Sequence, residues 1–128
     1  MDKLEIKATS RTPEVLFDFD NNHLKISGES YPEDAMEFYN PILDSLDAYL
    51  ENLGSGNCRF DFELIYFNSS SAKVIMMLMD KLDEAAENGG LVEVYWYYDA
   101  EDDTMEELGE EFGEDLEHAK FHLEKMED

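Results

Sequence analysis

Basic residues are scarce in this chain of 128 residues. Nine Lys and Arg stand against 33 Asp and Glu, which gives a formal net charge of −24 at pH 7. Such a surface repels the phosphate backbones of nucleic acids and the anionic head groups of membranes. The composition therefore argues against nucleic acid and membrane as binding partners.

Cysteines and long apolar runs are scarce as well. Cys58 is alone, which excludes an internal disulfide, and its apolar neighbourhood predicts a small buried side chain in a reducing compartment. The longest apolar run, Val74 to Met79, is far too short to span a bilayer, and Met1 to Ser10 lacks the apolar stretch of a secretory signal. We expect a soluble cytoplasmic protein.

Metal-binding and catalytic patterns are incomplete. Asp18 to Asn22 with Glu29 has the spacing of an EF-hand loop, but His23 stands where that loop needs glycine, and the flanks alternate like strands. His118 and His122 would share one helix face, as zinc ligands can, with no further ligand patterned nearby. The chain has no Gly-rich phosphate loop and no ordered Ser-His-Asp arrangement. We therefore predict no metal, no cofactor and no enzymatic activity.

The spacing of apolar residues predicts alternating strands and helices. We expect strands at Leu4–Ile6, at Val15–Phe19 and His23–Ser27 in a hairpin around Asp20-Asn21-Asn22, at Cys58–Phe67 and at Leu91–Tyr98. We expect a helix after Tyr31-Pro32, with helical spacing from Met36 to Leu53 and an end at Gly54, and further helices from Ser70 to Glu87 and from Thr104 to Leu116. A last short strand or helix end is expected at Phe121 and Leu123.

Two of these segments carry finer expectations. In the strand that ends at Phe67, alternation places Phe60, Phe62, Leu64 and Tyr66 on one face and the residues between them, with Phe67, on the other. In the first helix, Pro41 removes a hydrogen-bond donor, so the helix is expected to kink there or to restart with Asn40 as its cap.

This order of elements predicts an α/β fold class. We expect a single domain over residues 1–128, with a mixed β-sheet of about four to five strands and helices packed mainly on one face. Strands joined by helical crossovers should be parallel, because such connections need a dozen residues or more.

Four polar residues stand at the junction between the strand ending at Phe67 and the next helix: Asn68, Ser69, Ser70 and Ser71. Asn and Ser are preferred N-caps, so a plain cap explains one such residue but not four. A phosphate on one of these hydroxyls would sit at the positive end of the helix and add roughly two negative charges. The cluster therefore has two interpretations, a helix cap and a phosphorylation switch.

Four segments carry a resemblance to a known family. They are Ser30-Tyr31-Pro32-Glu33, Tyr66 to Ser71 with Lys73, Trp96-Tyr97-Tyr98-Asp99, and Glu110-Glu111-Phe112 with Glu114-Asp115. In this order they resemble the SiaC family of bacterial regulatory phosphoproteins, almost end to end. That family is itself similar to the STAS domains of anti-sigma-factor antagonists, in which a strand leads into a helix through a turn that carries the phosphorylated residue.

The resemblance implies a non-enzymatic switch. A kinase phosphorylates one hydroxyl of the turn, a phosphatase removes the phosphate, and only the unmodified form binds its effector, a diguanylate cyclase that controls biofilm formation. The family's acceptor is a threonine directly after the asparagine, and this chain departs from it with Ser69. Alignment to the more distant STAS pattern would place the phosphate on Ser70 instead. Ser69 is our first choice and Ser70 the second, and the turn around Ser69 is shaped by Asn68, Ser70, Ser71 and Lys73.

The surface that meets the effector is open to two interpretations. The methionines between Val74 and Met79 widen the apolar stripe of their helix, which favours a place in the core. Met76 and Met77 also suit a surface that repacks on partners, and we include them with Tyr31 as partner-binding candidates.

Two other functions remain open on sequence grounds. An anti-sigma-factor antagonist would share the mechanism and differ in its partner. An acidic decoy that mimics DNA would use the strip from Asp99 to Glu117, which holds eleven acidic residues and no basic one. A solvated helix face explains the same strip, and a decoy would not need the serine turn.

Overall fold

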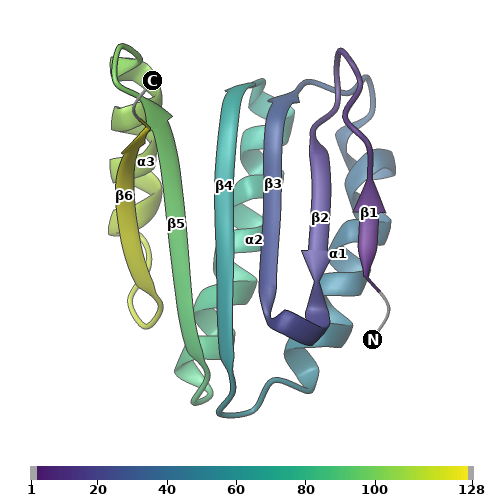
Figure 1. Ribbon diagram of the computed structural model, residues 1–128, viewed down its shortest axis with the longest axis vertical. Coiled ribbons are helices and arrows are strands. Elements are labelled where there is room, and N and C mark those ends of the chain that lie inside the picture. The colour runs from purple at the N-terminus through teal and green to yellow at the C-terminus, as the bar shows by residue number, and fades with distance from the viewer. Residues whose placement is uncertain (1–2, 127–128) are drawn as a thin grey trace.

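The computed structural model describes residues 3–126, in which three helices cover one face of a six-stranded sheet (Figure 1). The strands are β1 (Leu4–Ile6), β2 (Glu14–Asp18), β3 (His23–Ser30), β4 (Asn57–Phe67), β5 (Leu91–Asp99) and β6 (Lys120–Met126). The helices are α1 (Ala35–Glu51), α2 (Ser69–Glu87) and α3 (Asp103–Glu114), and a 3-10 turn, η1 (Phe19–Asn21), joins β2 to β3. The expected α/β class is confirmed, with one strand more than the four to five predicted.

The strands lie in the sheet in chain order. β1, β2 and β3 are antiparallel, whereas β3 to β6 are parallel and joined through the three helices. The predicted hairpin and parallel crossovers are therefore confirmed. Because the parallel strands all point the same way, the carboxyl ends of β3, β4 and β5 share one edge of the sheet, and each helix begins there (Figure 1).

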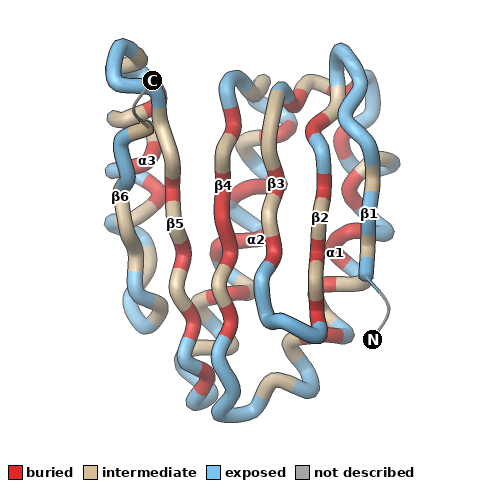
Figure 2. Tube along the Cα trace, viewed as in Figure 1, coloured by how far each residue is buried: buried red, intermediate tan, exposed pale blue. Residues whose placement is uncertain are grey.

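The core lies between the sheet and the helices. Buried residues alternate over most of β2, β3 and β5, whereas Phe60, Asp61 and Phe62 are buried in succession in β4, and the edge strands β1 and β6 have no fully buried residue (Figure 2). The largest fully buried side chains include Trp96, Tyr39, Phe17, Phe60 and Phe62. Within residues 3–126, no helix is long and apolar enough to cross a bilayer.

A β-bulge at Ile65 changes which side chains of β4 face the core. Gly28 of β3 lies opposite Leu64, and the next residue of β3 lies opposite Tyr66, so Ile65 is an extra residue in β4. Beyond the bulge the alternation reverses: Tyr66 is 51% exposed, whereas the ring of Phe67 packs near Trp96. The predicted faces are therefore wrong for Tyr66 and Phe67, because period-two reasoning assumes an unbroken ladder.

The helix ends differ slightly from expectation. α1 begins after Asp34, whose carboxylate accepts a hydrogen bond from the Glu37 N–H at 3.1 Å, and it continues through Pro41 without a break. The predicted restart with Asn40 as a cap is therefore wrong. α2 begins at Ser69, one residue before the predicted start, and residues 120–126 form a strand.

Candidate functional site

The strand-to-helix turn lies at the edge of the sheet where β4 ends and α2 begins. Asn68 is the N-cap of α2, and its side-chain Oδ1 accepts a hydrogen bond from the Ser71 N–H at 2.9 Å. The Asn68 N–H donates to the backbone oxygen of Ser30 at 3.1 Å, which ties the turn to the end of β3. Asn68 thus meets the capping requirement without help from a serine side chain.

The three serines have different environments. Ser69 and Ser70 are exposed on the first turn of α2, at the positive end of the helix dipole. Ser71 is fully buried, with 0% of its surface exposed. Two hydroxyls are therefore accessible to a modifying enzyme, and the third belongs to the interior.

Ser71 belongs to a buried chain of hydroxyl groups. The Ser30 Oγ donates to the Ser71 Oγ at 2.9 Å and lies 2.6 Å from the Tyr39 hydroxyl oxygen. Burial raises the pKa of Tyr39 to about 12, against the opposing effect of its hydrogen bond with Ser30. Tyr39 is therefore protonated at neutral pH and can donate its proton to Ser30. The chain connects β3, α1 and the first turn of α2.

The outer face of α2 continues from Ser69 along the helix. Lys73, Met76 and Met77 are exposed on this face, and the two methionines have 48% and 37% of their surface in contact with solvent. Residues four, seven and eight positions after Ser69 lie on its side of a helix. The expectation that the methionines belong to the core is thus wrong for Met76 and Met77 and correct for Met79, which is 3% exposed.

Aromatic rings border the turn on the sheet side. Tyr31 follows β3, and its ring meets that of Tyr66 edge to face, with 5.8 Å between centroids. The Arg11 guanidinium carbon lies 5.6 Å from the centre of the Tyr31 ring, and the Tyr31 N–H donates to the backbone oxygen of Arg11 at 2.7 Å. Tyr31 was predicted at this site, whereas Tyr66 reaches the surface only because of the bulge.

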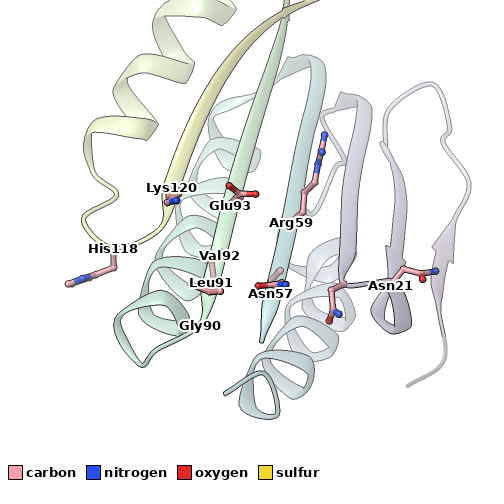
Figure 3. Close-up of a pocket in the computed structure, with 11 residues that line it drawn as sticks. Asn21, Asn57, Arg59, Gly90, Leu91, Val92, Glu93, His118 and Lys120 are labelled. Carbon is pink, nitrogen blue, oxygen red and sulfur yellow. The ribbon is translucent and has the colours of Figure 1, made fainter. Parts of the chain in front are cut away.

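A hollow of about 530 Å³ lies at the opposite edge of the sheet, where β4 and β5 begin (Figure 3). Arg59 lines it, but its guanidinium already donates to Asp61 at 2.9 Å and to the Tyr97 hydroxyl at 2.7 Å. Cys58 also lines the hollow, and burial raises the pKa of its thiol to about 11, against the effect of a hydrogen bond with Tyr49. The thiol is therefore protonated at neutral pH, which does not suit a nucleophile.

In the structure, the residues of the EF-hand-like pattern and of the histidine pair are not arranged as metal ligands. Asp18 pairs with His23 at one end of β3, whereas Glu29 lies near the other end. His118 lies in the loop after α3, and His122 lies on β6 with its ring stacked on Tyr95, so the expected shared helix face is wrong. Within residues 3–126, no group of three or more His, Cys, Asp or Glu is arranged to hold a metal ion.

Residues 6–126 match the model of the family described as SiaC family regulatory phosphoprotein. This chain belongs to the SiaC family. A protein of Pseudomonas aeruginosa strain UCBPP-PA14, described as uncharacterized, is 36% identical over 115 residues, which are 90% of each chain. The structure of SiaC of Pseudomonas aeruginosa is 33% identical, with a TM-score of 0.90, and the match covers 98% of this chain and 100% of that one.

A second solved structure is described as the diguanylate cyclase SiaD in complex with its activator SiaC, also from Pseudomonas aeruginosa. Its matching chain is 33% identical, with a TM-score of 0.90, and the match covers 96% of this chain and 99% of that one. A relative with this fold is thus known as the activator of a diguanylate cyclase.

Sequence reasoning missed the contacts beneath the turn. Ser30 and Tyr39 were not among the expected site residues, because nothing in the spacing of a serine and a tyrosine nine positions apart indicates a shared buried bond with Ser71. Ser30 at the end of a strand reads as an ordinary turn residue. The three hydroxyls meet only in the folded structure, where the end of β3, α1 and the start of α2 come together.

Proposed function

We propose that this protein is a phosphorylation-controlled activator of a diguanylate cyclase. The unmodified form binds the cyclase, and a phosphate on Ser69 ends the binding. The protein acts by binding and catalyses no reaction itself. The observation that carries the proposal is the position of Ser69: it is exposed at the start of α2, on the face that presents Met76 and Met77, in a family with a known cyclase activator.

The fold tolerates a phosphate at this position. The first N–H groups of a helix have no intrahelical acceptors, and the helix dipole favours negative charge there. Lys73 is exposed one turn further along the same face and can pair with a phosphate on Ser69. A modified protein should therefore remain folded, so the phosphate acts on binding.

A partner that packs on this face must cover Ser69. Met76 and Met77 supply apolar area that repacks on a partner, and Tyr31 with Tyr66 extends the surface around the turn. Covering a phosphorylated Ser69 would take a dianion out of water without a matching set of basic residues from this chain, which is costly. The surface thus supports binding that one modification can abolish.

A kinase and a phosphatase complete the proposed switch. The kinase transfers the terminal phosphoryl group of ATP to the Ser69 oxygen, which loses its proton, and ADP leaves. The phosphatase hydrolyses the ester, which restores the hydroxyl and releases inorganic phosphate. Ser70 is the second choice as acceptor, because it is exposed on the same turn. Ser71 is unsuited, because it is fully buried.

The test is affinity capture from a lysate of the source organism with wild type, Ser69→Ala and Ser69→Asp, with bound proteins and phosphosites identified by mass spectrometry. We expect a diguanylate cyclase on wild type and Ser69→Ala and its loss from Ser69→Asp. An anti-sigma factor in its place would assign the same switch to another partner. Identical proteins on all three baits, with no phosphate on Ser69 or Ser70, would refute the proposal.

A further inference from the structure

We propose that Ser30, Tyr39 and Ser71 are positioning residues for the turn: their buried hydroxyls hold the first turn of α2 in the one geometry that the partner recognises. This inference rests on the proposed function, and it assigns a role to three residues that neither contact solvent nor carry the phosphate. The geometry that supports it is a continuous set of bonds from α1 through β3 to α2.

The chain of bonds has a direction. Ser30 donates to Ser71, so its oxygen is left to accept the proton of Tyr39. Tyr39 and both serines are at most 1% exposed, so no bulk water can replace a lost partner. A buried hydroxyl without a partner is costly, and these bonds therefore favour one arrangement of the three elements.

Three further hydrogen bonds connect the buried hydroxyls to the exposed turn. Asn68 bonds to two of the three residues that carry the buried hydroxyls. Its N–H donates to the backbone oxygen of Ser30, and its side chain accepts from the Ser71 N–H. The Ala72 N–H donates to the backbone oxygen of Asn68 at 2.9 Å. Ser69 thus lies between Asn68 and Ser71, whose positions these hydrogen bonds define.

An ordinary core would not need this arrangement. Apolar residues of similar volume would fill the space beneath α2 without buried polar groups to satisfy. Packing alone lets a helix end fray or shift along its axis, whereas hydrogen bonds to Asn68 and Ser71 define the position of the first turn. A defined position of the first turn matters for a surface on which one side chain decides whether a partner binds.

The decisive variant is Tyr39→Phe, which keeps the ring and removes the hydroxyl. Tyr49→Phe is the matched control: Tyr49 lies on the same helix, is also buried, and donates to the Asn22 side chain at 2.7 Å near the opposite edge of the sheet. Tyr39→Phe removes the hydrogen bond to Ser30, whereas Tyr49→Phe removes the hydrogen bonds to Asn22 and Cys58. Both variants should remain folded. Only Tyr39→Phe should affect the turn.

Two readouts separate positioning from general stability. Amide hydrogen exchange at Ser71 and Ala72 should become about tenfold faster in Tyr39→Phe, since the loss of one hydrogen bond is worth about a factor of ten, and should be unchanged in Tyr49→Phe. The affinity of the unphosphorylated protein for the diguanylate cyclase recovered by affinity capture should fall several-fold in Tyr39→Phe alone. Equal effects of the two variants on both readouts would overturn the proposal.

A double variant tests whether the hydroxyls act as one unit. Ser30→Ala should accelerate exchange at Ser71 as much as Tyr39→Phe does, and combining the two should add little, because either change breaks the same chain. Independent, additive effects would contradict the inference. If the wild-type protein does not bind the cyclase, the proposed function fails, while the exchange comparison still decides whether these residues position the turn.

Discussion

At the scale of single residues, the turn divides its tasks among four neighbours. Asn68 caps the helix, Ser71 belongs to the buried chain of hydroxyls, and Ser69 and Ser70 are exposed. A residue that already caps a helix frees its neighbours from that requirement, which explains why a modifiable hydroxyl can stand at the first helical position. The structure thus places the cap on Asn68, and the proposed switch concerns the exposed Ser69 and Ser70.

Replacement of the cap tests this division. Asn68→Ala should lower the free energy of unfolding by about 1 kcal/mol, because the Ser71 N–H loses its acceptor. Asn40→Ala, at an exposed position inside α1, is the matched control and should not destabilise the protein. Urea unfolding measures both. A stability loss from Ser69→Ala that equals the loss from Asn68→Ala would show that Ser69 shares the capping role.

Close packing on α3 depends on Gly109. A Cβ at this position would lie 2.4 Å from Trp96 Cδ1 and 2.8 Å from Leu123 Cδ1. Gly109→Ala should therefore destabilise the protein by about 1–3 kcal/mol despite the better helix propensity of alanine. Glu110→Ala, at the next and exposed position, is the control. Unchanged or increased stability of Gly109→Ala in urea unfolding would mean that α3 packs less closely.

At the scale of elements, sequence patterns predicted most of the fold. The hairpin, the three helices and the parallel strands followed from apolar spacing and from the lengths of the connections. The sequence pattern of β6 does not distinguish a strand from a helix end, because its charged residues and histidine interrupt any regular spacing. β4 was found, but the bulge at Ile65 depends on the register with β3, which no local pattern reveals.

The loop between α3 and β6 is held by one carboxylate. The Asp83 side chain on α2 accepts hydrogen bonds from the backbone N–H groups of Glu117, His118 and Ala119, at 2.8 to 3.3 Å. Burial acts to raise the pKa of Asp83, but these N–H groups outweigh it and hold the pKa below the ordinary value of 3.8. The ionised form is therefore favoured by folding.

This lowered pKa predicts a pH dependence. The stabilisation by Asp83 is fully present above its unfolded pKa and is lost as the pH falls through the lower pKa of the folded state. Asp83→Asn should reduce stability at pH 7, and the difference from wild type should shrink between about pH 5 and pH 2. The control is Asp80→Asn, exposed on the same helix. Urea unfolding measures the free energy of unfolding of each protein across this pH range. A difference between wild type and Asp83→Asn that does not change with pH would contradict this account.

At the scale of the whole molecule, the net charge of −24 limits how a phosphate on Ser69 would act in the proposed switch. Two additional charges change the long-range field little, and salt screens that field beyond about 10 Å at 0.1 M ionic strength. The modification must therefore act locally, through the charge and the desolvation of one covered group. This is a reason to expect the partner to contact Ser69 itself.

Salt separates this mechanism from that of an acidic decoy. Association with a basic partner surface should weaken as salt is raised, but the difference in affinity between Ser69→Ala and Ser69→Asp should persist, because a covered charge is screened little. Binding of both variants to the captured cyclase, measured by calorimetry from about 0.05 to 0.5 M NaCl, provides the comparison. A difference that vanishes at high salt would favour recognition by overall charge.

The central claim is tested most directly by the rate at which the captured diguanylate cyclase makes cyclic di-GMP. The rate is measured alone, with the unmodified protein, and with protein phosphorylated stoichiometrically at Ser69, with Ser69→Ala as the control that cannot be modified there. We predict activation by the unmodified protein and by Ser69→Ala and no activation by the phosphorylated form. Equal activation by the phosphorylated and unmodified forms would contradict the account.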